Sequence, residues 1–174
     1  MNIAKVITSD IANGLGIRLS IFISGCNNHC DGCFNKDLWN FDYGYEYNDN
    51  IGNKILDELS KSQYDGISIL GGEPLDINNQ YEVSNIIKLV KSKYPNKNIW
   101  IFSGYLYEEL QPGGKMYISD NITGYILNNI DVLVDGKFDI TKKDYRLKFK
   151  GSSNQRVIDV KKSIKEGKVV LLNL

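Results

Sequence analysis

The chain has 174 residues, enough for one domain with a substantial hydrophobic core. Its 21 Lys and Arg residues balance 21 Asp and Glu residues, and this net charge of +0 argues against a general nucleic-acid-binding protein. No apolar run approaches the roughly 18 residues that a membrane span needs, and the segment "MNIAKVITSD" lacks the pattern of a signal peptide. We therefore expect a cytoplasmic protein of one domain, residues 1–174, that binds neither nucleic acid nor a membrane.

Predicted strands and helices alternate in the first half of the chain. The segment "IRLSIFI" (17–23) is rich in β-branched and aromatic residues, which predicts a strand. Apolar residues spaced four apart behind the capping candidates Asp49 and Asn50 predict a helix over 50–60. The segment "GISIL" (66–70) predicts a short buried strand that ends at a pair of glycines.

The second half continues this alternation. In chain order we expect a helix over 83–90 that ends before Pro95, a strand at 98–102, a short helix near 105–110, a loop at 111–115, a helix over 120–130 and a strand at 131–134. Asp159 is expected to cap a helix that stops at Gly167, and 168–172 is expected to form a last strand. The repeated order of strand and helix predicts an α/β fold with a mostly parallel sheet. At this length we expect a partial barrel that is open on one side.

The unusual residues of the sequence fall directly after the predicted strands. In such folds the chemistry gathers at the carboxyl ends of the strands, on the loops that follow them. These loops carry, in order, Cys26–Cys33, Gly71–Gly72–Glu73–Pro74, Ser103–Gly104–Tyr105 and Asp135–Gly136–Lys137. We therefore expect all four loops to lie on one rim.

The stretch "SGCNNHCDGCFN" (24–35) contains all three cysteines of the chain and its single histidine. Three thiols cannot all be paired in disulfides, because one is left over, and a cytosolic protein seldom contains disulfides. A metal site is the more natural use of three thiols so close in sequence. The glycine, asparagine and aspartate residues between the cysteines permit the turns that such a site requires.

Two kinds of metal site are compatible with this loop. Zinc would take Cys26, Cys30, Cys33 and His29 as four tetrahedral ligands, although the adjacency of His29 and Cys30 makes simultaneous ligation awkward. An iron–sulfur cluster would use the three thiolates alone. A four-iron cluster normally has four cysteine ligands, so three would leave one iron open to an external ligand. We favour the cluster, with a non-catalytic zinc-binding interaction module as the alternative.

The C-x3-C-x2-C spacing without a fourth cysteine resembles the radical S-adenosylmethionine superfamily. Members of that superfamily bind a [4Fe-4S] cluster through the three cysteines and place S-adenosylmethionine on the open iron. The segment "LGGEPL" (70–75) is similar to their Gly-Gly-Glu motif. The resemblance implies that Gly71, Gly72 and Glu73 hold the amino group of S-adenosylmethionine.

Four further segments resemble one branch, the activating enzymes of anaerobic ribonucleoside-triphosphate reductases. They are "GCFN" (32–35), "LWNF" (38–41), "DVLVDGKF" (131–138) and "FKGSSNQRVIDV" (149–160). The resemblance extends from about residue 10 to 172, but the tract 111–125 matches no pattern. The resemblance to this branch implies a partial (β/α) barrel of the radical S-adenosylmethionine type. The cofactor contacts that it implies are Gly32, Cys33, Phe34, Asp135 and Lys137, besides the Gly-Gly-Glu turn.

The same resemblance implies a reaction. A reductant, flavodoxin by analogy with the family, would reduce the cluster on Cys26, Cys30 and Cys33. Cleavage of S-adenosylmethionine would then give methionine and a 5′-deoxyadenosyl radical. This radical would take a hydrogen atom from a glycine in the large subunit of the reductase, leaving a glycyl radical there. Activation of another glycyl-radical enzyme, such as a formate-lyase, is the alternative within this class.

Charge is distributed unevenly along the chain. Residues 137–168 contain eleven Lys and Arg residues against four Asp and Glu residues, and the first 136 residues have the opposite excess. This basic segment is either a solvated face or a docking surface for an acidic partner.

Overall fold

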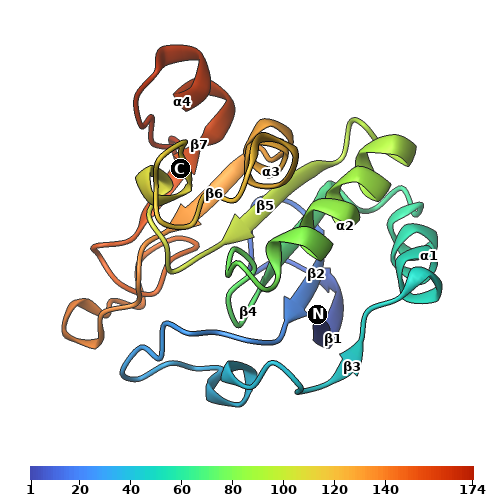
Figure 1. The fold of residues 1–174 in the computed structure, drawn as a ribbon, viewed down its shortest axis with the longest axis horizontal. Coiled ribbons are helices and arrows are strands. Elements are labelled where there is room, and N and C mark those ends of the chain that lie inside the picture. Colours follow the sequence, from blue (N-terminus) through green and yellow to red (C-terminus); the bar gives the residue numbers. More distant parts are fainter.

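A seven-stranded mixed sheet is the frame of the computed structural model, which describes residues 1–174 (Figure 1). The strands are β1 (Asn2–Asp10), β2 (Arg18–Ile23), β3 (Tyr45–Glu46), β4 (Gly66–Gly71), β5 (Asn98–Phe102), β6 (Val132–Asp135) and β7 (Arg156–Asp159). Their order across the sheet is β3-β1-β2-β4-β5-β6-β7. Neighbours among β2, β4, β5 and β6 are parallel, whereas β1, β3 and β7 pair in antiparallel fashion.

Four α-helices accompany the sheet (Figure 1). They are α1 (Asp49–Leu59), α2 (Gln80–Lys93), α3 (Tyr125–Asn129) and α4 (Val160–Glu166). The side chain of Asp159 accepts a hydrogen bond from the backbone of Lys162 at the start of α4, and Gly167 ends this helix with a φ of 64°. None of the helices has the length and apolar character needed to cross a membrane.

Most of the predicted elements are confirmed. The strands expected at 17–23, 66–70, 98–102 and 131–134 correspond to β2, β4, β5 and β6. The helices expected over 50–60 and 83–90 correspond to α1 and α2, and α4 lies between its expected cap and its expected stop. The short helix near 105–110 is a 3₁₀ turn, and the helix over 120–130 consists of one π-helical turn followed by α3. At α1, however, the capping residue is Asn48 and neither Asp49 nor Asn50.

The strand expected at 168–172 is wrong. Within this segment only Leu171 forms a β-bridge, and its partner is Ile158 of β7. The backbone N–H of Val170 donates to the Ser163 hydroxyl at 2.9 Å, so this amide is not available for a regular ladder. The mostly parallel sheet is also only partly confirmed, because the antiparallel strands β1, β3 and β7 were not expected.

The two faces of the sheet have different coverings. Alternate side chains of a strand point to opposite faces, and one set forms the main core with the helices. This set includes Ile21, Ile23, Ile69, Ile101 and Leu133. The alternating set forms two smaller clusters and includes Phe22, Leu70, Trp100, Phe102 and Val134. The face with the smaller clusters is the one that lines the candidate site.

Candidate functional site

The cysteine loop, Ser24–Asn35, follows β2 and is held by the short 3₁₀ helix that comes after it, Lys36–Trp39. The backbone N–H of Gly25 donates to the carbonyl of Leu38 at 2.8 Å, and that of Cys26 donates to the carbonyl of Trp39 at 3.2 Å. The loop therefore returns on itself and brings Trp39 beside the first cysteine.

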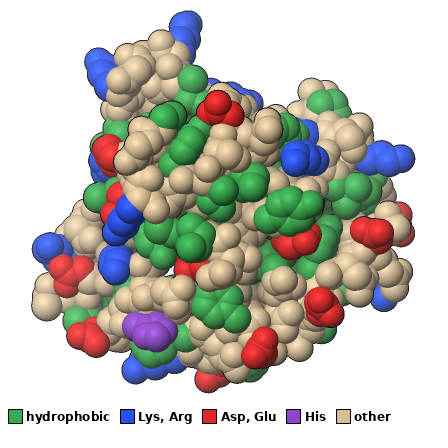
Figure 2. Space-filling view, viewed as in Figure 1, with side chains coloured by type: hydrophobic (Ala, Val, Ile, Leu, Met, Phe, Trp, Pro, Cys, Tyr) green, Lys and Arg blue, Asp and Glu red, His purple; other side chains and the backbone are tan.

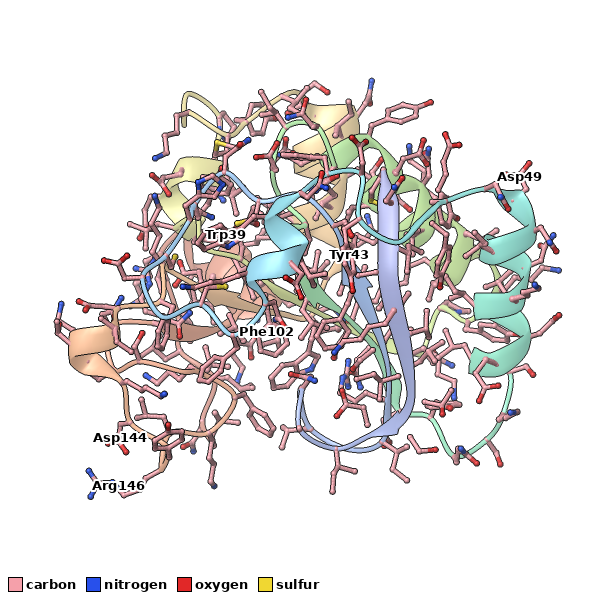
Figure 3. The ribbon with its side chains drawn as sticks, turned by 90° about the horizontal axis from the view of Figure 1, so that it is seen from below. Trp39, Tyr43, Asp49, Phe102, Asp144 and Arg146 are labelled. Carbon is pink, nitrogen blue, oxygen red and sulfur yellow. The ribbon has the colours of Figure 1, made fainter.

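A cavity of about 240 Å³ lies between the cysteine loop and the carboxyl ends of β4, β5 and β6. All three cysteines line it, together with Gly71, Gly72 and Glu73 of the turn after β4. Its other walls include Trp39 from the cysteine side and Phe102 from β5 (Figure 3). A second hollow of about 330 Å³ shares Phe102, Val134, Gly151 and Gln155 with this cavity, so the two are adjacent on the inner face of the sheet. The sequence-based prediction of one shared rim therefore agrees with the geometry for all four loops, the fourth of which reaches the cavity through Gly136.

Glu73 connects three of the loops around the cavity. Its side chain is only 1% exposed. One carboxylate oxygen accepts from the backbone of Leu75 at 3.0 Å and from the Ser103 hydroxyl at 2.7 Å. The other accepts from the Asn28 amide at 2.8 Å and from the backbone of Gly104 at 2.6 Å. Burial raises the pKa of Glu73 to about 7, and the donors from Ser103, Gly104 and Leu75 oppose the rise.

The glycine at position 72 permits close contact between the turn after β4 and the cysteine loop. A Cβ atom at Gly72 would lie 2.6 Å from the carbonyl oxygen of Gly25 and 2.7 Å from that of Leu38. Any side chain here would push the two loops apart, because both neighbouring atoms belong to the backbone. Gly72 thus has a structural role in positioning the cysteines, besides its place in the cavity wall.

The far wall of the cavity is formed where the connection between β6 and β7 begins and ends. The Gln155 amide donates to the carbonyl of Gly136 at 2.8 Å, and its oxygen accepts from the backbone of Gly151 at 2.9 Å. The Asn154 amide donates to the carbonyl of Lys137 at 2.9 Å. The polar residues of "GSSNQR" therefore fasten the base of this connection, and Gln155 also lines the cavity.

Asp135 is engaged in a buried ion pair. It is 0% exposed, and its carboxylate accepts from the Arg156 guanidinium at 2.9 and 2.5 Å and from the backbone of Tyr107 at 2.7 Å. Arg156 also binds Glu108 with two hydrogen bonds, and these contacts raise the pKa of Arg156. Neither Asp135 nor Lys137 lines the cavity, whereas Gly136 between them does.

Two of the thiols, those of Cys26 and Cys30, lie in surroundings that disfavour their charged form in the absence of a metal. Burial raises the pKa of Cys26 to about 11, although backbone N–H groups of Asn28 and His29 act in the opposite direction. Burial also raises the pKa of Cys30, against a backbone hydrogen bond from Phe138. No three His, Cys, Asp or Glu side chains meet closely enough to hold one metal ion. In a four-iron cluster each thiolate binds a different iron, so the thiols need to surround a common space, and all three of them line this cavity.

Several lining residues were not among the predicted cofactor contacts, although Ser103 and Gly104 were expected on the same rim. They are Asn28, Asn35, Trp39, Phe102, Ser103, Gly104, Phe138, Gly151 and Gln155. Phe34, expected at the cofactor, does line the cavity but is 68% exposed. Gly32 is not among the lining residues. The ring of His29 stacks on Trp39 with the ring centres 4.5 Å apart, and His29 does not line the cavity.

Comparison with known proteins relates this site to a family. A family model described as a 4Fe-4S single cluster domain matches residues 12–158. An anaerobic ribonucleoside-triphosphate reductase-activating protein of Enterobacteria phage T4 is 33% identical over 157 residues, which cover 90% of this chain and 93% of that protein. Proteins with the same name from Pasteurella multocida and Escherichia coli K12 are 36% and 35% identical, and the matches cover 89% and 90% of this chain and 95% and 97% of the relatives. The chain belongs to this family of reductase-activating proteins.

Membership of the reductase-activating family indicates which metal group the three thiols of the cavity bind. The matched region, 12–158, contains the cysteine loop, the turn after β4 and nearly all of β7. The family model describes one four-iron cluster, and the three cavity-lining thiols are the only thiols of the chain. An iron–sulfur cluster is therefore the metal group that this family membership supports.

We predict that Arg156→Met destabilises the protein by about 3 kcal/mol, because it leaves the carboxylate of Asp135 buried without its partner. Denaturant unfolding of the metal-free protein measures the change. The matched control is Arg146→Met, which removes an exposed ion pair with Asp144 at 2.9 Å and should leave the free energy of unfolding nearly unchanged. Equal effects of the two substitutions would show that the Asp135–Arg156 pair has no special structural role.

We also predict that Glu73 makes the metal-free protein less stable as the pH rises. Its pKa is about 7 in the fold against an ordinary value of 4.5, so its stabilising contribution is complete below pH 4.5 and is lost as the pH passes 7. Between about pH 5 and about pH 8, the free energy of unfolding should fall more for the wild type than for Glu73→Gln. Glu46→Gln, which removes an exposed carboxyl group, should keep the wild-type slope. Parallel pH profiles for wild type and Glu73→Gln would contradict this account.

Proposed function

We propose that this protein activates an anaerobic ribonucleoside-triphosphate reductase by generating a glycyl radical on the large subunit of that enzyme. The observation that carries the proposal is the common cavity of the three thiols and the Gly-Gly-Glu turn in a chain of the reductase-activating family. The protein is accordingly an enzyme, an oxidoreductase whose substrate is another protein.

The proposed cluster ligands are Cys26, Cys30 and Cys33. They fit a [4Fe-4S] cluster because they reach the same cavity from one short loop and because backbone N–H groups lie near the sulfur atoms of the first two. Such N–H groups stabilise the charge of cluster sulfurs and influence the reduction potential. The thiols remain free, as ligation requires.

The proposed place of S-adenosylmethionine is the remainder of the cavity, on the side of Gly71, Gly72 and Glu73. The buried negative charge of Glu73 favours a cationic amino group nearby, and such a group would in turn favour the ionised form of Glu73. Phe34 and Cys33 line the same cavity. The roles of Gly32, Asp135 and Lys137 as cofactor contacts stay predictions; the ion pair with Arg156 gives Asp135 a structural role in addition.

Cys26, Cys30 and Cys33 would hold the cluster, which with S-adenosylmethionine would supply the radical chemistry needed to remove a hydrogen atom from a glycine Cα of the reductase. The residues of this chain perform the remaining tasks. Glu73 fixes the cysteine loop against the loops after β4 and β5, so the thiols and the Gly-Gly-Glu turn keep their relative positions. Phe102, Val134 and Leu70 form an apolar floor, which limits the access of water to a reactive species.

The proposal also includes the type of fold, the electron donor and the location in the cell. We interpret the four parallel strands, with helices on one face and the site on the other, as a partial (β/α) barrel of the radical S-adenosylmethionine type formed by a single domain, residues 1–174. A flavodoxin-like protein is the proposed electron donor. The cytoplasm is the proposed location, because thiols remain reduced there.

Two alternatives have less support. A formate-lyase activator would share the chemistry, but the relatives are named as activators of the ribonucleotide enzyme. A zinc module would need a fourth ligand, and the ring of His29 stacks on Trp39 outside the cavity.

We predict that Cys33→Ala reduces iron incorporation to background after anaerobic reconstitution and abolishes radical formation on the reductase, because one of the three ligands is lost. His29→Ala is the matched control from the same loop and should retain both properties. Iron and sulfide analysis measures the first property, and electron paramagnetic resonance of the reductase measures the second. A glycyl radical formed by Cys33→Ala would refute the mechanism, whereas loss of stoichiometric zinc in His29→Ala would support the zinc module.

A further inference from the structure

We propose that Phe138, Ile140, Lys143 and Tyr145 form the surface on which the glycine-bearing segment of the reductase docks. We call these four residues the docking face. The inference rests on the proposed function and extends it to the position of the protein substrate. All four residues belong to the connection between β6 and β7.

Unusually exposed apolar groups gather at this face. Tyr145 is 85% exposed and Ile140 is 44% exposed. The ammonium group of Lys143 lies 4.6 Å from the centre of the Tyr145 ring and 4.7 Å from that of the Phe34 ring. Phe34 is itself 68% exposed, and its ring centre lies 5.9 Å from that of Phe138. An aromatic and aliphatic patch of this kind, rimmed by charge, is typical of a protein interaction site.

The connection that presents the docking face is held in place rather than loose. Lys143 pairs with Ser152 in an antiparallel bridge. On the inner side, Phe149 packs edge-on against Trp100 with ring centres 5.2 Å apart. Phe149 therefore fixes the connection between β6 and β7 to the sheet, while Tyr145 remains exposed to solvent. A surface that is ordered before binding loses less conformational entropy when a partner arrives.

The docking face continues into the cavity. Phe138 and Phe34 both line the cavity wall. The side chain of Ile140 lies so close to the cysteine loop that a Cβ atom at Gly32 would be 2.7 Å from its Cδ1 atom. A chain segment lying on the docking face would therefore be next to the cavity that holds the thiols.

The charge of this region indicates the chemistry of the partner. Residues 137–150 contain six basic and two acidic side chains. Both acidic side chains, Asp139 and Asp144, already form ion pairs within the segment, with Lys142 and Arg146. Figure 2 shows basic side chains on this edge of the molecule, and Figure 3 shows Asp144 and Arg146 at the outer end of the connection. The remaining positive charge favours a partner segment that is flanked by carboxylates.

The protein substrate fits this position better than the electron donor does. A hydrogen atom is transferred by direct contact, so the glycine must enter the cavity and its flanking residues must cover the rim. An electron can pass through intervening protein, so the donor need not approach from this side. The surface continuous with the cavity therefore belongs to the segment that is chemically modified.

The test is direct binding of the reductase large subunit, measured by calorimetry with the full-length, reconstituted activating protein. The variant Lys143→Glu/Tyr145→Ala should weaken binding by about tenfold or more, because it removes an exposed aromatic anchor and reverses a charge. The matched control Lys54→Glu/Tyr81→Ala changes an exposed lysine and a 59%-exposed tyrosine on α1 and α2, and it should bind as the wild type does. Circular dichroism establishes that both variants are folded.

Cleavage of S-adenosylmethionine by chemically reduced protein in the absence of the reductase separates this inference from the proposed function. We expect the docking-face variant to cleave at the wild-type rate. Unchanged reductase binding by that variant, or equal weakening by the control, would overturn the docking face. A slower reduction by flavodoxin without any loss of reductase binding would instead assign the face to the electron donor and also overturn it. Absence of cleavage by the wild type would contradict the proposed function, whatever the binding result.

Discussion

The site depends on one buried carboxylate. Glu73 accepts four hydrogen bonds, and they come from its own turn, from the cysteine loop and from the loop after β5. Removing such an acceptor would leave four donors without this partner, two of them in buried hydrogen bonds, which costs far more than one lost hydrogen bond. The three loops can thus keep one relative arrangement although none of them has regular secondary structure. The pKa of about 7 is the consequence of placing this charge where water is excluded.

The division of the sheet into two faces explains why the site can be open in so small a protein. Helices cover one face and form the main core with alternate strand residues. Loops cover the other face, so polar groups, thiols and a cavity can be placed there without disturbing the main core. The ion pair between Asp135 and Arg156 and the hydrogen bonds of Gln155 then hold the last wall, between β6 and β7. At this rim, residues that hold the loops in place therefore lie next to residues that are proposed to bind the cofactors.

Local patterns in the sequence predict the central strands, the helices and the cysteine loop because those features depend on periodicity, capping and spacing over a few residues. The antiparallel strands β1 and β7 were missed because they depend on partners distant in sequence. The residues of β7 were interpreted only as part of the family motif at 149–160. The same limitation applies to the site. The Gly-Gly-Glu turn could be located from its position after a strand, but the partners Asn28 and Ser103 lie 45 and 30 residues away from Glu73. Asp135 was expected at a cofactor from the family resemblance, and the sequence did not show that it also forms an ion pair with Arg156, 21 residues further along the chain.

The most direct test of the central claim is low-temperature electron paramagnetic resonance of the anaerobically reconstituted and reduced protein, with and without S-adenosylmethionine. We expect the signal of a reduced four-iron cluster, and we expect this signal to change when S-adenosylmethionine is added, because one iron would have no protein ligand. A cluster signal that S-adenosylmethionine leaves unchanged would contradict the open iron. Failure to form any cluster, with stoichiometric zinc in its place, would contradict the enzyme altogether.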